Sequence, residues 1–155
     1  MKWAYGVTAV LERHENGLLK RTLDSLAGAG FAEPWLFVDG DNDWERWRSA
    51  YPALVGITLR YPKIRTFGNW MLGMAELFFR EPKADRFAMF QDDVVCSRSL
   101  REYLERCKYP EKGYWNLITY PANQKPIPHD AIGWFPAAER GKGAQGLVMD
   151  RETIL

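Results

Sequence analysis

The sequence contains little cysteine or histidine, no long hydrophobic run and no excess of charge of either sign. Its 155 residues include two cysteines and two histidines, too few for a disulfide framework or for a zinc site with typical ligand spacing. No stretch approaches the roughly 18 apolar residues of a transmembrane helix, and residues 1–3 do not begin the apolar run of a signal peptide. The net charge of +1 favours neither nucleic acid nor a membrane surface as a partner. We therefore expect a cytoplasmic protein that has no membrane span and binds no nucleic acid.

The cysteines and histidines are expected to be isolated side chains. Cys96 and Cys107 flank a predicted helix roughly 15 Å long at about 1.5 Å per residue, which is too long for a disulfide to bridge. Both are therefore predicted to be free thiols. His14 and His129 have no ligand-like neighbours in the sequence, a pattern more typical of surface or loop positions than of a metal site.

The length is sufficient for one domain with a sizeable core, so residues 1–155 are expected to form a single domain. Stretches rich in β-branched and aromatic residues alternate with stretches of helical periodicity. This order predicts an α/β fold of three layers, α/β/α, in which helices cover both faces of a mostly parallel, Rossmann-like sheet. The strands are expected at residues 3–11, 34–39, 56–59, 87–95, 115–120 and 146–149.

The expected helices lie between these strands and have recognisable beginnings. Asn16 is expected to cap the first helix, after a polar turn at residues 12–16. Thr66 would cap the helix with the strongest apolar periodicity in the chain. Ser99 and Glu102 have the spacing of a capping box. A short helix is expected near residues 44–51, and residues 150–153 would begin the last one.

The segment before the last strand is expected to be a long loop. Residues 121–139 hold four of the nine prolines and little periodicity, which is typical of an ordered or functional loop. Trp134 in this loop would either stack on a sugar ring or anchor the loop in the core. Residues 141–146, GKGAQG, match the dinucleotide pattern G-x-G-x-x-G, but they follow a proline-rich loop and lead into an apolar stretch instead of a helix. We interpret them as a flexible loop over the active site.

The most informative stretch is FAMFQDDVV at residues 87–95, an apolar run with two adjacent carboxylates near its end. Such a run is typical of a buried parallel strand, whose carboxyl end delivers side chains to the crevice where open α/β sheets bind ligands. Asp92 and Asp93 repel each other, so a nearby cation would explain the pair. Carboxylate oxygens favour Mg²⁺ or Mn²⁺. Taken alone, the pair fits an acidic turn that caps backbone N–H groups equally well.

Charged residues at the other predicted strand ends favour the ligand site. Arg13 follows the first strand, Asp39 and Asp41 follow the second, and Arg65 precedes the third helix. Because parallel strands end at one edge of a sheet, we expect all four to converge on one crevice with the adjacent carboxylates. A diphosphate needs such cations, and a ribose or base edge needs such acids. The alternatives are a solvated loop charge for Arg13, and turn or capping roles for Asp39 and Asp41.

This order of features resembles the nucleotide-sugar-dependent glycosyltransferases of the GT-A fold, particularly the family 2 enzymes and the Golgi N-acetylglucosaminyltransferases. The resemblance covers nearly the whole chain and is diffuse. It is carried by VTAVLER with LLKRTLDSL, LFVDGD, RTFGNWMLGMAELFF, FQDDVV followed by SRSLREYLE, and GAQGLVMDRETIL. The family carries its acidic metal motif, D-x-D or E-D-D, at a strand end before a helix.

The resemblance implies a role for each matching residue. Asp93 would hold a Mn²⁺ or Mg²⁺ ion that bridges the diphosphate, and Asp92 would contact the ribose or the sugar. Asp39 would read the nucleobase. Thr8 and Arg13 would lie beside the nucleotide.

The resemblance also implies the activity, with one departure from the family motif. Gln91 stands where the motif often has an acid, so it would hydrogen-bond the sugar without adding charge. The family's catalytic base commonly lies beyond the last strand present here, so no base is assigned and the acceptor part would be missing. The expected function is metal-dependent transfer of a sugar from a nucleoside-diphosphate sugar, expected to be a UDP-sugar, to an acceptor hydroxyl.

Two alternative functions remain open. A nucleotidyltransferase shares the strand-end acids but normally opens with a glycine-rich phosphate loop, where this chain has residues 12–17. A non-catalytic module would hold a nucleotide or a sugar without turnover.

Overall fold

The computed structural model describes residues 1–118, 133–134 and 145–155. Within these residues the chain is a mixed α/β structure with six strands and six helices. The strands are β1 (Trp3–Val10), β2 (Trp35–Asp39), β3 (Gly56–Arg60), β4 (Arg86–Gln91), β5 (Trp115–Asn116) and β6 (Gly146–Asp150). The helices are α1 (Leu11–Glu15), α2 (Leu18–Gly28), α3 (Trp44–Ala50), α4 (Arg65–Arg80), α5 (Leu100–Arg106) and α6 (Arg151–Ile154).

The strands form one sheet with a parallel core. Their order is β3-β2-β1-β4-β6-β5, and the pairs β3 with β2, β2 with β1, and β1 with β4 are parallel. β6 runs antiparallel to both β4 and β5. The expected parallel sheet is therefore confirmed for its core, and β6 adds an antiparallel part that the sequence pattern did not predict.

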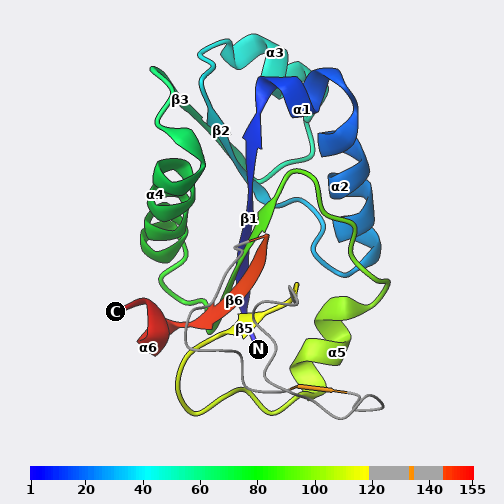
Figure 1. The fold of residues 1–155 in the computed structure, drawn as a ribbon, viewed down its shortest axis with the longest axis vertical. Coiled ribbons are helices and arrows are strands. Elements are labelled where there is room, and N and C mark those ends of the chain that lie inside the picture. Colours follow the sequence, from blue (N-terminus) through cyan, green and yellow to red (C-terminus); the bar gives the residue numbers. More distant parts are fainter. Residues whose placement is uncertain (119–132, 135–144) are drawn as a thin grey trace.

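Alternate residues of the strands pack against helices on opposite faces of the sheet. In β4, Ala88 and Phe90 belong to a core shared with α2, α3 and α5, whereas Phe87 and Met89 belong to a core shared with α4. Figure 1 shows α4 on one side of the sheet and α2 on the other. Burial on both faces explains why β4 is apolar at consecutive positions.

α4 agrees well with its sequence pattern. Trp70, Met74 and Leu77 recur at intervals of three and four residues, and all three are buried against the sheet. The helix begins at Arg65, so Thr66 lies in its first turn and is not the N-cap residue.

The prediction of a polar turn at residues 12–16 is wrong, because α1 occupies most of this segment and continues directly from β1. Its sequence, LERHE, has no repeated apolar position from which a helix could be predicted. Asn16 follows α1, and its Oδ1 accepts a hydrogen bond from the backbone N–H of Leu18 at 3.1 Å. Asn16 therefore caps α2 from the position before Gly17, which is the N-cap residue.

The prediction of a capping box at the start of α5 is also wrong. Ser99 is the N-cap residue, but it adopts a left-handed conformation with φ 57° and its side chain makes no capping hydrogen bond. Glu102 pairs instead with Arg106, one turn later in the helix. The Ser99 N–H donates to the Gly28 carbonyl at 3.2 Å, so contact with the end of α2 fixes the start of α5.

The remaining expectations concern the thiols and the second half of the chain. Cys96 and Cys107 are free, as predicted. β5 covers only the beginning of the strand expected at residues 115–120. Among the described residues, no helix is long and apolar enough to cross a bilayer. Residues 119–120 of that strand, most of the 121–139 loop with His129, and residues 141–144 of the glycine pattern lie outside the described residues.

Candidate functional site

A cleft of about 140 Å³ lies at the carboxyl ends of β1, β2 and β4. In Figure 1 this edge of the sheet is the upper end of β1, from which α1 continues. The parallel register explains the grouping, because Thr8 pairs with Gln91 and Val10 pairs with Asp39. The lining residues are Thr8, Ala9, Val10, Arg13, Asp39, Thr66, Asn69, Gln91, Asp92 and Asp93.

Asp92 and Asp93 share one guanidinium. Asp92 is 8% exposed, and its Oδ2 accepts a hydrogen bond from the Val10 N–H at 2.9 Å. Its Oδ1 lies 3.8 Å from Arg13 Nε, while Asp93 Oδ2 accepts a hydrogen bond from Arg13 Nη2 at 3.2 Å. Arg13 therefore offsets part of the repulsion between the two carboxylates.

The pKa of Asp92 reflects this environment. Burial raises the pKa of the Asp92 carboxyl to about 6, and the negative charge of Asp93 acts in the same direction. The hydrogen bond from Val10 and the charge of Arg13 lower the pKa, but they do not outweigh burial. A divalent cation near Asp92 would favour the ionised form in the same way as Arg13 does.

α1 brings Arg13 to the carboxylates. The helix begins at Leu11, directly after β1, so Arg13 lies just beyond the carboxyl end of the central strand. The Arg13 side chain is 37% exposed and lines the cleft. It is therefore available to a phosphate group that enters the cleft, and its planar fork is well suited to phosphate oxygens.

Two buried oxygen atoms of cleft residues have no hydrogen-bond partner in the part of the chain that the structure describes. Asp39 Oδ1 accepts a hydrogen bond from the Ile64 N–H at 2.8 Å, which leaves Oδ2 unpartnered. Asn69 Nδ2 donates to the Phe37 carbonyl at 2.8 Å, which leaves Oδ1 unpartnered. Buried acceptors without partners are rare and cost free energy. A ligand with N–H or O–H donors would satisfy them.

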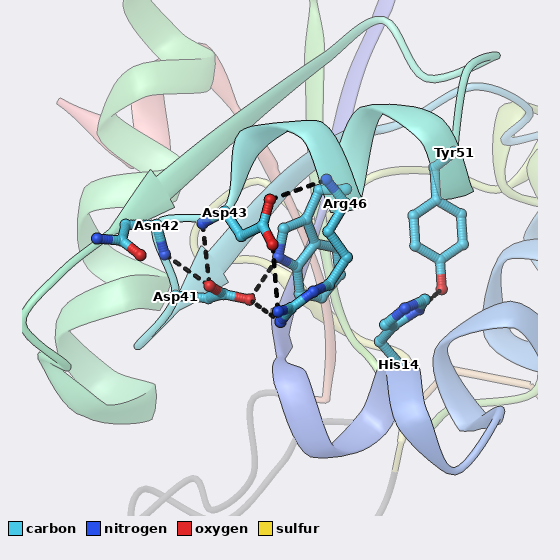
Figure 2. Close-up of polar contacts among 7 residues, drawn as sticks. His14, Asp41, Asn42, Asp43, Arg46 and Tyr51 are labelled. Atoms are coloured by element: carbon cyan, nitrogen blue, oxygen red, sulfur yellow. Dashed lines mark hydrogen bonds and ion pairs between the residues drawn. The ribbon is translucent and has the colours of Figure 1, made fainter.

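Asp41 does not line the cleft, contrary to the expectation that it converges with the other strand-end residues. Its Oδ2 accepts hydrogen bonds from Trp47 Nε1 at 2.9 Å and Arg46 Nη1 at 3.0 Å. Its Oδ1 accepts hydrogen bonds from the backbone N–H groups of Asn42 and Asp43, a turn that Figure 2 shows together with Arg46. Burial raises the pKa of Asp41, but these hydrogen bonds and Arg46 outweigh it and lower the pKa. The capping alternative is the better description of Asp41.

Arg65 is likewise absent from the cleft lining. It is exposed at the first position of α4 and has a positive φ of 69°. Thr66 and Asn69, from the first two turns of the same helix, line the cleft instead. The expectation that Arg65 converges on the cleft is therefore not met, and two polar residues of the same helix line it instead.

His14 has a specific partner, although its sequence suggested an isolated histidine. Its Nδ1 lies 2.8 Å from the Tyr51 hydroxyl, and its ring lies 5.1 Å from that of Trp47. Figure 2 shows His14 and Tyr51 pointing toward each other from α1 and the end of α3. This contact fixes α1, and hence Arg13, against α3.

Asn69 is a cleft residue to which the sequence pattern gave no role in the site. It belongs to the buried stripe of α4, among Trp70, Gly73 and Met74. A polar amide within an apolar stripe was the available signal, because a buried amide needs hydrogen-bond partners.

Trp134 packs against other aromatic rings. Its ring is stacked with that of Trp115 at 5.1 Å and with that of Tyr103 at 6.3 Å. Trp134 is also 43% exposed, so these contacts hold it at the surface and do not make it an anchor buried in the core.

The described residues contain no group of three or more His, Cys, Asp or Glu side chains that could hold a metal ion. A cation at Asp92 and Asp93 would therefore need further oxygen ligands from a bound molecule or from water. No protein-family model matches the chain. A search of curated proteins also gave no significant match.

Proposed function

We propose that this chain is a metal-dependent glycosyltransferase that moves a sugar from a nucleoside-diphosphate sugar, expected to be a UDP-sugar, to an acceptor hydroxyl. The observation that carries the proposal is the grouping of Asp92, Asp93 and Arg13 in the cleft at the carboxyl ends of β1 and β4. Such strand ends are where open α/β sheets bind nucleotides. Two acids beside one cation suit a metal–diphosphate complex.

The donor set fits Mn²⁺ or Mg²⁺. Mg²⁺ is commonly bound by one or two carboxylates together with substrate phosphates and water, so Asp93, with Asp92 beside it, supplies what the protein needs to contribute. When bound, the ion would neutralise charge on the departing nucleoside diphosphate. Arg13 would stabilise the same charge from the protein side.

The opposite end of the cleft supports a nucleobase site. Asp39 and Asn69 each present a buried, unpartnered oxygen, and these oxygens would accept hydrogen bonds from the N–H groups of a base. Thr8 and Gln91 lie side by side on β1 and β4 and line the same cleft. There Gln91 would hydrogen-bond the sugar.

The fold supports the finer architecture that we propose, a three-layer, Rossmann-like core of the GT-A type. Helices pack on opposite faces of a sheet whose first four strands are parallel. α1 occupies the position directly after β1, where a nucleotidyltransferase would carry a glycine-rich phosphate loop. This position of α1 favours sugar transfer over nucleotidyl transfer.

A second candidate, binding without turnover, is favoured by one observation. The described lining of the cleft contains three carboxylates, and the proposal assigns Asp92 and Asp93 to the metal end and Asp39 to the base. No further carboxylate or histidine of this lining is left to take the proton of an acceptor hydroxyl.

Hydrolysis of UDP-sugars in the presence of Mn²⁺, measured as UDP release, tests the proposal. We expect release with the unmodified chain and a loss of at least about a hundredfold in Asp93→Asn, because the metal loses its anionic ligand. Asp24→Asn is the matched control, since Asp24 pairs with Lys20 on the surface of α2. Full activity in EDTA contradicts the metal role, pyrophosphate release from a nucleoside triphosphate favours the nucleotidyltransferase, and UDP-sugar binding without release favours the binding module.

A further inference from the structure

The outer face of α4 is apolar along most of its length. Phe67 and Phe79 are each 77% exposed, and Met71 and Leu72 are about half exposed. Ala75 is exposed between them. From Phe67 to Phe79, a span that the structure describes in full, the one charged residue is Glu76, whose side chain is 28% exposed and is paired with Arg60 and Arg80.

This arrangement is unusual for a helix that covers a sheet. Such a helix normally presents charged and polar residues opposite its buried stripe. The inner stripe of α4, which includes Trp70, Met74 and Leu77, is already buried against the sheet. The helix is therefore apolar on both sides, a pattern typical of a helix that is buried all round, and apolar patches of this kind mark interaction sites.

We propose that a second copy of this chain covers the outer face of α4, so that two α4 helices pack across a two-fold axis. A two-fold interface brings the same surface of each copy into contact, so it must be complementary to itself. A face that carried charge of one sign would repel its copy, whereas an uncharged apolar face buries equally well against itself. The face from Phe67 to Phe79 meets this requirement.

The size of the face agrees with an interface between two proteins. Ile64 is 36% exposed just before the helix and lies against Gly68 in the first turns of α4, so it extends the apolar surface. With about 150–250 Å² for a whole aromatic side chain, the five large exposed apolar side chains, Ile64, Phe67, Met71, Leu72 and Phe79, present on the order of 600 Å² per copy. A standard interface buries roughly 800 Å² per partner, so this face supplies most of the area and polar residues at its rim would supply the rest.

The spacing along α4 defines how two copies fit. Phe67, Met71, Ala75 and Phe79 follow one another at intervals of four residues and form a single ridge. Ridges of this spacing on two helices interdigitate at a crossing angle of about −50°. A two-fold axis at the level of Gly73 would place each Met71 opposite Ala75 of the other copy, so that a large side chain faces a small one.

The charges around the patch argue against a membrane surface as the occupant. An interfacial helix carries many basic residues on its polar face. The cations beside the patch are at the ends of α4, namely Lys63, Arg65 and Arg80. Arg80 is already paired with Glu76 at 3.1 Å. These three cations at the two ends of α4 provide little attraction for anionic lipid.

Sedimentation equilibrium of the intact chain between about 1 and 100 µM tests the dimer. We expect twice the mass of one chain for the wild type. Phe67→Glu and Met71→Glu should each raise the dissociation constant at least about tenfold. Each substitution would place one negative charge from each copy in the same two-fold interface, where the two charges repel. Ala75→Trp should also weaken the dimer, because it fills the space opposite Met71. All three positions are exposed in a single chain, so the substitutions should leave the monomer folded, which circular dichroism checks.

Val55→Glu is the matched control, because Val55 is also an exposed apolar residue, at 57%, but lies outside α4. It should dimerise like the wild type. A wild type that stays monomeric at about 100 µM overturns the proposal, as does a dimer that the three α4 substitutions leave as strong as the control does. A monomer that binds vesicles of phosphatidylcholine and phosphatidylserine through α4 overturns it in favour of a membrane surface.

Discussion

Asp92 combines burial with few stabilising partners. Among the described residues, its carboxylate accepts a hydrogen bond from the Val10 N–H at 2.9 Å and lies 3.8 Å from the cation of Arg13. Asp93 follows it directly, so a second negative charge is close by. The chain therefore holds a carboxylate whose ionised form is poorly supported until another cation arrives.

The environment of Asp92 predicts that the stability of the folded chain depends on pH. The pKa of Asp92 is raised from 3.8 to about 6, first by burial, so the folded chain binds this proton more tightly than the unfolded chain does. The contribution of Asp92 to stability is fully present below about pH 3.8 and is lost as pH rises through about 6. Asp92→Asn lacks this titration, so its midpoint of thermal unfolding should rise relative to wild type between pH 4 and pH 7.

Differential scanning calorimetry of both chains without metal or nucleotide measures this difference. A change of about 1 kcal/mol moves the midpoint by roughly 2–4 °C in a chain of this size, so a gain of a few degrees is expected. Asp24→Asn removes an exposed carboxylate and should track the wild type across the range. A constant difference between Asp92→Asn and wild type from pH 4 to pH 7 would contradict the raised pKa.

At the scale of elements, the pairing of β2 with β3 depends on a glycine. Gly56 lies opposite Trp35 in the register of these strands. A Cβ at Gly56 would overlap Cζ3 of the Trp35 ring and would lie 2.6 Å from Cε3. The Arg80 guanidinium also stacks on the Trp35 ring, 4.5 Å from the ring centre. The indole therefore covers the glycine and has little room to move.

Gly56→Ala should destabilise the chain by about 1–3 kcal/mol, the usual cost of overpacking. Urea unfolding followed by tryptophan fluorescence measures the loss as a lower midpoint at unchanged slope. Gly28→Ala is the control, since nothing lies within 4 Å of a Cβ built at the end of α2. It should be neutral or stabilising by up to about 1 kcal/mol. Equal midpoints for the two variants would mean that the Trp35 ring moves aside at little cost.

The elements that could be predicted are those whose core contacts repeat along the sequence. β4 is apolar at consecutive positions because both of its faces are buried, and α4 repeats its buried residues at three and four. α1 has no such repeat, since none of its residues is buried. The antiparallel direction of β6 could not be predicted either, because burial on a strand leaves the same pattern in both directions.

The positions of site residues could be predicted where the topology of the sheet determines them. They could not be predicted where a side chain bonds to partners in its own turn. Asp39, Asp92 and Asp93 line the cleft because neighbouring parallel strands end at one edge. Asp41 is only two residues beyond Asp39, but it bonds to Arg46 and Trp47 in its own turn. Such local competition depends on side-chain geometry that sequence spacing does not specify.

At the scale of the whole molecule, the cleft joins elements that are far apart in the sequence. Arg13 comes from α1, Asp39 from β2, Asn69 from α4 and Asp93 from the turn after β4. These elements surround β1, which pairs with both β2 and β4. A ligand that contacts several of them binds only the folded chain, so its binding energy adds to the free energy of unfolding.

UDP together with Mn²⁺ should therefore raise the midpoint of thermal unfolding. At a ligand concentration of about 100 times the dissociation constant, the gain is about 2.7 kcal/mol, or roughly 5–10 °C for a chain of this size. Mn²⁺ alone should have a small effect, because the described residues do not form a complete metal site and the diphosphate must supply the remaining oxygens.

A set of thermal unfolding curves with UDP alone, Mn²⁺ alone and both together separates these contributions. Asp93→Asn should lose the part of the shift that depends on Mn²⁺ and keep any part due to UDP alone, because Arg13, Asp39 and Asn69 remain in place. Asp24→Asn should show the full shift. A shift with both ligands that is no larger than the sum of the separate shifts, or one that Asp93→Asn retains, would mean that metal and diphosphate do not bind together at Asp93.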